Sequence, residues 1–398
     1  ADYKSPECSG KIQEMNFQKT VAFIETILYN WPAIRQRNKS GSGAAHRSVL
    51  VVRRVNTMQS FSIGVDLGGT NMRIAALDDS GRRLETICTD TLVNRGRDRV
   101  IDEMCAAITQ LADKFGASHD FAGVGVGVPG IIDLERGIVC AAPNLPDWAN
   151  YPVKAQIQER LGTPVVLEND ANCAALGEKW MGAGRDISGL CMVTLGTGVG
   201  GAFIFNGAVW HGMIGMAGEI GHMTVTPDGP SCGCGNRGCL EQFASATAIK
   251  RMAAEDAAAG NAPELARAMN ENPEFSAKMV FQYALQGDPV AQQIFNRVGW
   301  ALGVVLSGLV DALNLPMYVI GGGVSSAWEA FSPALIRELR RRSIVFRASD
   351  PADNHVSEKK KTIVTRALLG GDAGLIGAAR LPLLSADPPA MVRRRISA

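Results

Sequence analysis

The sequence predicts an α/β protein of two domains with a ligand-binding cleft between them. Three observations support this prediction. Residues 63–70 and residues 192–205 each show a buried strand, a Gly-Thr turn and a second strand, so the chain contains the same unit twice. Strand and helix patterns follow one another over residues 61–128 in the order β-β-β-α-β. At 398 residues the chain is longer than one hydrophobic core usually serves, so two domains are expected.

The first half of the chain has a clear order of elements. Residues 61–66 form an apolar strand that ends in a glycine-rich turn, and residues 72–77 return as a second strand. Residues 78–81, Asp-Asp-Ser-Gly, are typical of a hairpin turn. Apolar side chains recur at helical spacing over residues 98–115, and residues 122–128 form the next strand. This order resembles one half of the ribonuclease-H-like fold. We therefore expect two ribonuclease-H-like (actin/hexokinase-like ATPase) domains with a central cleft.

The second half continues the α/β pattern. Residues 247–286 predict surface helices, and residues 290–313 predict a long, nearly apolar helix in the core of the domain. Residues 317–321 form a strand before a glycine-rich turn. A last strand at 363–365 and a helix at 371–379 complete the fold.

Residues 1–57 do not continue these patterns, and at most one short helix is predicted there. Met58 directly precedes the first strand, so we expect the working protein to begin near Met58. The segment before it is expected to be disordered, or to derive from upstream sequence or from the expression vector. We expect the rest of the chain to comprise a small domain (58–174) with a closing helix (376–384), a large domain with a cysteine-rich loop (175–375), and a disordered tail (385–398).

Composition excludes several classes of partner. The net charge is +1, so bulk electrostatics favour neither a nucleic acid nor a membrane surface. No uninterrupted apolar run reaches the roughly 20 residues that span a bilayer. The nine Cys are an odd number and several lie in apolar runs, which is typical of a reducing compartment. We therefore expect a cytoplasmic protein without nucleic-acid or membrane partners.

The paired glycine-rich turns predict phosphate binding. Glycines allow backbone N–H groups to converge on phosphate oxygens, and Thr hydroxyls add donors. Each turn leads into a strand rather than a helix, which argues against a dinucleotide site. One such turn alone would be weak support, because glycine-rich hairpin turns are common. The candidate phosphate-binding residues are Gly68, Gly69, Thr70, Gly196, Thr197 and Gly198.

Asp66 ends the first strand and faces the first turn. A carboxylate there needs a cation or donors, and it could support the Mg²⁺ of a nucleotide through water. The alternative is an Asp that only caps the turn.

A Cys₃His set predicts a zinc site. One His and three Cys fall between residues 222 and 239, and glycines separate the thiols. Thiolate and imidazole ligands suit tetrahedral Zn²⁺, and glycines with positive φ let the backbone wrap around an ion. The alternative is four unrelated residues in a glycine-rich loop. The candidate ligands are His222, Cys232, Cys234 and Cys239.

This stretch also carries a family resemblance. The pattern G-E-x-G-H, nine residues, then C-x-C-G-x-x-G-C-x-E resembles the signature of the ROK family of sugar kinases and repressors. The resemblance covers about residues 59–380. It implies an ATP-dependent hexose or N-acylhexosamine kinase. In kinases of this fold, a turn like the one at Gly321, Gly322 and Gly323 binds adenosine, although it could be a plain strand-to-helix turn.

The resemblance also implies roles for individual residues. Asp170 in Asn-Asp-Ala-Asn resembles the catalytic base and Asn169 a ligand of a sugar hydroxyl, whereas the alternative for Asp170 is a helix cap. His222 would bind zinc through one nitrogen and the sugar through the other. Asn144 suits a sugar hydroxyl or a turn, and Glu168 either binds the sugar or supports residues that do. Glu219 and Glu241 would complete the sugar contacts.

The expected reaction is transfer of the γ-phosphoryl group of ATP to the C6 hydroxyl of glucose, with Mg²⁺ and a structural Zn²⁺. Glucose is favoured because the Pro-Asn-Leu-Pro-x-Trp loop and Glu-Asn-Asp resemble the glucokinases of the family. The alternatives are an N-acetylmannosamine or N-acetylglucosamine kinase, a fructokinase, or a sugar-responsive repressor. A repressor is disfavoured because no helix-turn-helix precedes residue 58. We expect a homodimer or a homotetramer.

Overall fold

The computed structural model describes residues 58–91, 93–142 and 145–384. The predicted extension at 1–57, the predicted tail at 385–398 and the candidate ligand Asn144 lie outside the described residues.

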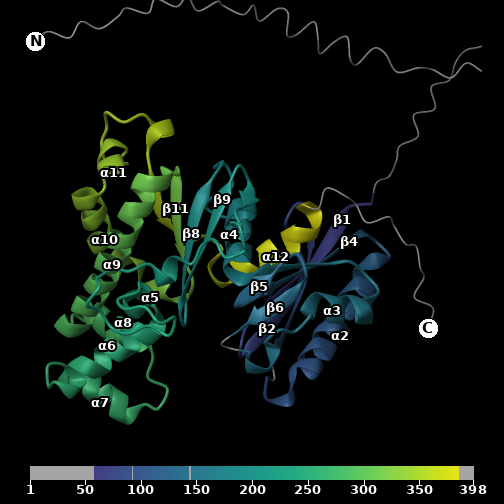
Figure 1. Ribbon diagram of the computed structural model, residues 1–398, viewed down its shortest axis with the longest axis horizontal. Helices are drawn as coiled ribbons and strands as arrows, with labels where there is room; N and C mark the ends of the chain where they lie inside the picture. The colour runs from purple at the N-terminus through teal and green to yellow at the C-terminus, as the bar shows by residue number, and fades with distance from the viewer. Residues whose placement is uncertain (1–57, 92, 143–144, 385–398) are drawn as a thin grey trace, which may run out of the picture. The chain divides into compact units, whose positions relative to one another are not determined.

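The first sheet has five strands in the order β3-β2-β1-β4-β7. β2 is antiparallel to β1 and β3, whereas β4 runs parallel to β1 and β7. Both faces of β1 are covered. Phe61, Ile63 and Val65 are buried on one face, and Ser62 is buried on the other, where its hydroxyl donates to the Ala379 carbonyl at 2.6 Å. α2 and α3 pack on one face of this sheet, and α12 packs on the other face (Figure 1). The elements of this part are β1 (Ser60–Leu67), β2 (Asn71–Asp78), β3 (Arg83–Asp90), η1 (Val93–Arg95), α2 (Arg97–Gly116), β4 (Asp120–Val128), β5 (Ile131–Asp133), β6 (Ile138–Ala141), η2 (Pro146–Trp148), α3 (Val153–Leu161) and β7 (Val165–Asn169).

The second sheet repeats the arrangement, with the order β10-β9-β8-β11-β12. β8 and β9 form an antiparallel hairpin, and β11 runs parallel to both β8 and β12. The repeated strand–turn–strand unit expected from the sequence is therefore present once in each sheet. The strands are β8 (Leu190–Leu195), β9 (Val199–Phe205), β10 (Ala208–Val209), β11 (Met317–Gly321) and β12 (Ile363–Arg366).

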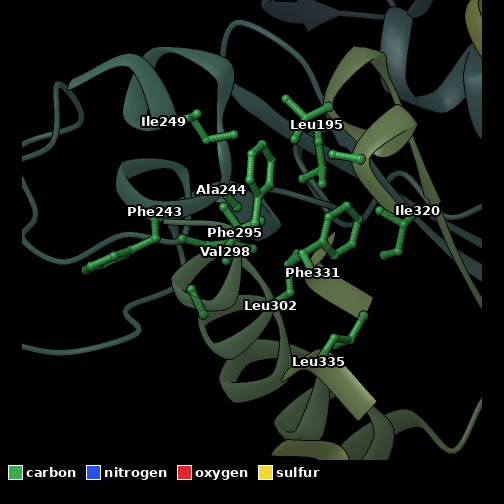
Figure 2. Close-up of a cluster of buried hydrophobic side chains, with 14 of the residues drawn as sticks. Leu195, Phe243, Ala244, Ile249, Phe295, Val298, Leu302, Ile320, Phe331 and Leu335 are labelled. Carbon is green, nitrogen blue, oxygen red and sulfur yellow. The ribbon is translucent and has the colours of Figure 1, made fainter. Parts of the chain in front are cut away.

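Helices with large buried side chains build the core beside the second sheet. Phe295, Val298 and Leu302 on α9 meet Phe331 and Leu335 on α10 (Figure 2). Among the described residues, α9 alone is long and apolar enough to cross a membrane, and 61% of its most apolar window is buried in the fold. The sequence predicted this helix as a core element, and its packing confirms that prediction. The elements of this part are η3 (Ile220–His222), α5 (Glu241–Ala244), α6 (Ala246–Ala258), α7 (Pro263–Glu271), α8 (Ala277–Leu285), α9 (Pro289–Leu313), η4 (Gly323–Ala327), α10 (Trp328–Arg342), α11 (Ile344–Ala348) and η5 (Glu358–Lys360).

Two helices link the sheets. α4 (Asp170–Met181) packs on β8 and β9, and α12 (Ala373–Leu384), preceded by η6 (Gly370–Asp372), packs on β1 and β4 (Figure 1). The two helices cross at glycines, since a Cβ on Gly177 would lie 2.1 Å from the carbonyl oxygen of Ala373. The expected domain boundaries after residues 174 and 375 fall inside α4 and α12, so that division stays a prediction.

Candidate functional site

A pocket of about 720 Å³ is lined by residues from both sheets. It brings together most of the residues that the sequence analysis proposed. Five proposed residues are outside its lining. Thr70, Gly321 and Gly323 are each next to a lining glycine, whereas Cys232 and Cys239 are two positions from Cys234 and Glu241. The proposed residues that line the pocket are Asp66, Gly68, Gly69, Glu168, Asn169, Asp170, Gly196, Thr197, Gly198, Glu219, His222, Cys234, Glu241 and Gly322.

The two glycine turns face this pocket from different sheets. The first turn is closed by a hydrogen bond from the Gly68 N–H to the Asn71 carbonyl (2.9 Å), and the second by one from Gly196 to Gly198 (2.9 Å). Glu241 braces the second turn, because its Oε2 accepts the N–H of Val199 at 3.0 Å. A Cβ on Gly198 would lie 2.4 Å from the same oxygen, so a side chain there would displace the Glu241 carboxylate.

Asp66 has a cationic partner that the sequence analysis missed. Its carboxylate pairs with the guanidinium of Arg73, which also donates to Asp372 (3.1 Å) and to the carbonyl of Gly371. Asp66 and Arg73 are direct neighbours in the β1–β2 register, so this hairpin pairing could have been read from the sequence. Arg73 supplies the positive charge that a carboxylate at the end of a core strand requires.

Asp170 is the first residue of α4, and its neighbour Asn169 is the helix cap. Asn169 Oδ1 accepts the N–H groups of Ala171 (2.9 Å) and Asn172 (3.3 Å), so the alternative role of Asp170 as the cap is wrong. Asn169 Nδ2 also donates to the Gly130 carbonyl at 3.2 Å. One N–H of that amide remains for a ligand, and its contact with a sugar hydroxyl stays a prediction.

The electrostatics of Asp170 differ from those of an ordinary carboxyl group. Desolvation raises its pKa to about 6, and the negative charges of Asp66 and Glu219 add to the rise. The N–H of Ala171, which donates to Asp170 Oδ1 at 2.8 Å, acts in the opposite direction. A carboxyl with this pKa changes between its neutral and charged forms close to neutral pH, as a general base requires.

Glu168 is 4% exposed and lies in a network of hydrogen bonds. Its Oε1 accepts the N–H of Asn169 and the side-chain amide of Asn172, both at 2.9 Å. Its Oε2 lies 2.7 Å from Nε2 of His211, and this contact raises the pKa of His211. The sequence did not predict a role for Asn172 or His211. Within the described part of the chain, Oδ1 of the buried Asn172 has no hydrogen-bond partner. Because 43 residues separate His211 from Glu168, no local pattern points to their pairing.

Glu219, His222 and Glu241 also line the pocket. The two ring nitrogens of His222 face different groups. Nδ1 lies 3.6 Å from Sγ of Cys232, and Nε2 lies 3.9 Å from a carboxylate oxygen of Glu219. One nitrogen is therefore turned to the cysteine cluster and the other to a pocket-lining carboxylate.

The cysteine cluster has the dimensions of a tetrahedral metal site. The ligand atoms of His222, Cys232, Cys234 and Cys239 all lie within 4.8 Å of one another, and the sulfurs of Cys234 and Cys239 are 3.7 Å apart. Zn–S bonds of about 2.3 Å in a tetrahedron place two sulfurs about 3.8 Å apart, so the four residues fit Zn²⁺. Gly235 and Gly238 take positive φ as expected, whereas the third glycine of the loop, Gly233, does not.

Comparison with known proteins identifies the family. The model of the ROK family matches residues 62–383. A glucokinase of Thermotoga maritima is 38% identical over 319 residues, which are 80% of this chain and 96% of that protein. A putative xylose repressor of Caldicellulosiruptor sp. is 30% identical over 369 residues, with 92% of this chain and 90% of that protein covered. The crystal structure of a ROK family glucokinase from Streptomyces griseus, in complex with glucose and AMPPNP, is 37% identical and superposes with a TM-score of 0.66 over 81% of this chain and 98% of that one. The chain described here belongs to the ROK family.

Proposed function

We propose that this protein is an ATP-dependent hexose kinase that phosphorylates the C6 hydroxyl of glucose. One observation carries the proposal: a single pocket joins two glycine turns to a carboxyl group with a pKa of about 6 and to a wall of polar side chains. The turns suit the phosphates of ATP, and the polar wall suits a sugar. The similarity to glucokinases supports glucose as the acceptor.

In this mechanism Asp170 is the general base. Its carboxylate accepts the proton of the C6 hydroxyl while that oxygen forms a bond to the γ-phosphorus and the bond to the ADP oxygen breaks. Glu219, His222 and Glu241 hold the sugar hydroxyls, and Asn169 offers its remaining amide N–H. When Mg²⁺ is bound with the nucleotide, it neutralises charge on the phosphates. Asp66 is the carboxylate that would support that ion, in a position where Arg73 already balances its charge.

We propose that the loop from His222 to Cys239 holds one structural Zn²⁺. Three thiolates and one imidazole are a standard donor set for zinc, and their mutual distances support it. Glu241 follows Cys239 by two residues, so the ordered loop also fixes the carboxylate that braces the N–H of Val199. The metal would thus stabilise both Glu241 as a proposed sugar contact and the glycine turn at residues 196–198.

A sugar-responsive repressor is the second candidate, favoured by one observation. The match to the putative xylose repressor covers 92% of this chain. Residues 58–398 alone are 341 of the 398 residues of this chain, which is about 86%. That match therefore reaches into the residues before 58. A test for binding of the full chain to DNA, with and without sugar, would distinguish the two candidates.

A panel of sugars with coupled detection of ADP tests the proposed reaction. Glucose, mannose, fructose, N-acetylglucosamine and N-acetylmannosamine are each supplied with ATP and Mg²⁺. We expect the highest kcat/KM with glucose and the product glucose 6-phosphate. A higher kcat/KM with an acylated amino sugar would transfer the assignment to a hexosamine kinase, and ADP formation that no sugar stimulates would refute a kinase.

A further inference from the structure

We propose that His211 is a positioning residue that joins the sugar side of the pocket to the catalytic segment through its hydrogen bond with Glu168. The proposal rests on the proposed function and adds a residue to it. We call the stretch from residue 211 to residue 219 the pocket loop. His211 begins this loop after β10 of the second sheet, and Glu168 lies near the end of β7 in the first sheet.

The carboxylate of Glu168 depends on its donors. A charge that is buried to this degree is costly unless hydrogen bonds satisfy it. Two of its three donors, the N–H of Asn169 and the amide of Asn172, belong to its own segment. The third donor is Nε2 of His211 at 2.7 Å, which reaches Glu168 from the other sheet. Because a carboxylate only accepts, that nitrogen carries the proton.

The pocket loop has little packing of its own. Met213 is 98% exposed and Ile214 is 67% exposed, so apolar burial does little to fix the middle of the loop. The carbonyl of His211 accepts the N–H of Ala217 at 3.0 Å, which ties the two ends of the loop together. The bond from His211 to Glu168 therefore fixes the closed loop against the first sheet.

This bond has a direct consequence for the pocket. Glu219 ends the pocket loop and is a proposed sugar contact, whereas the proposed base Asp170 follows Glu168 by two residues. The His211–Glu168 pair thus sets the position of one sugar contact relative to the base. Without it, sugar binding has to order the pocket loop, and this requirement lowers affinity. The phosphate turns are closed by their own hydrogen bonds, so ATP binding does not share this dependence.

The test combines kinetics with hydrogen exchange on the full-length protein. His211→Ala removes the donor, and His211→Phe removes it while keeping a ring of similar volume, in case the smaller side chain prevents folding. His211→Gln restores an N–H donor at a similar distance from the backbone. His355→Ala is the matched control, because His355 is exposed and does not line the pocket.

We expect His211→Ala and His211→Phe to raise the KM for glucose about 10- to 100-fold, the loss associated with a hydrogen bond to a buried charge. The kcat should fall less than the KM rises, the KM for ATP should stay within about twofold, and His211→Gln should recover most of the affinity. Equal losses in His211→Gln and His211→Ala, or an unchanged KM for glucose in all variants, would overturn the proposal.

Hydrogen exchange without substrate separates this proposal from the proposed function. Peptides covering 211–219 should exchange faster in His211→Ala than in the wild type and in His355→Ala. If the wild type phosphorylates no sugar, the proposed function fails while this measurement still decides the contact. Unchanged exchange in the pocket loop would refute the role of His211.

Discussion

Replacing Asp170 with Asn tests the proposed base most directly. The substitution keeps the shape of the side chain and removes its ability to accept a proton. General-base assistance is worth roughly 10²- to 10⁴-fold in rate, so we expect kcat to fall by that factor. The dissociation constant for glucose should change only a few-fold, because the lost interaction belongs to the transition state.

The raised pKa of Asp170 adds a second, independent expectation for folding. The rise from 3.8 to about 6 means that the folded protein holds the charged carboxylate less favourably than the unfolded chain does. Above pH 6 this difference corresponds to at most about 3 kcal/mol of lost stability, and less where water in the pocket screens the charge. Below pH 3.8 the carboxyl is protonated in both states and the difference disappears. Asp170→Asn should therefore be about 1–3 kcal/mol more stable than the wild type at pH 7.5 and equally stable near pH 3.5.

Two measurements check this pair of expectations. Steady-state kinetics give kcat, and denaturant unfolding at pH 7.5 and pH 3.5 gives the free energy of unfolding. In the wild type, kcat/KM should fall about tenfold for each pH unit below 6, as the base becomes protonated. An Asn variant with nearly normal kcat would remove Asp170 from the mechanism. A variant that is less stable than the wild type at pH 7.5 would contradict the proposed cost of desolvating this charge.

Three further predictions address other parts of the molecule. The purified protein should contain about one equivalent of zinc. Cys234→Ser should lose this zinc, whereas Cys88→Ser, which lies outside the cluster, should retain it. Metal analysis that finds no zinc in an active wild type would contradict the site. Gly198→Ala should raise the KM for ATP about tenfold, because its Cβ would lie 2.4 Å from Glu241 Oε2 and would displace the carboxylate that braces the turn. The KM for glucose should rise as well, since Glu241 is also a proposed sugar contact, and unchanged kinetics for both substrates would show that the turn tolerates a side chain. A chain that starts at Met58 should keep the Tm and the turnover of the full chain, because both sheets lie within residues 58–384, and loss of folding would refute this expectation.

The strands and their turns could be predicted because each is a local pattern. Apolar runs bounded by glycine mark β1, β4 and β8, and helical spacing marks α2 and α9. The cysteine cluster could be predicted for the same reason, since all four residues lie within one loop. The pairing of Asp66 with Arg73 was also within reach, because the hairpin register places the two residues opposite each other.

Other contacts depend on how the two sheets meet, and no local pattern contains that information. His211 and Glu168 lie on different sheets, so their hydrogen bond follows only from the folded arrangement. The start of α4 shows a smaller difficulty. Asn169 and Asp170 are both good capping residues, and only the backbone geometry assigns the cap to Asn169 and leaves Asp170 in the first turn.

The angle at which α4 crosses α12 at Gly177 sets the position of the proposed base at the start of α4. Asp170 begins the helix seven residues before Gly177, so about 10 Å of helix separates the carboxylate from the point of contact. A tilt of about 5° at the crossing displaces Asp170 by about 1 Å, a distance that matters for proton transfer. A change of side-chain volume where α4 crosses α12 can therefore alter the catalytic rate without contact to either substrate. Mutations selected for a changed rate could accordingly occur at this crossing.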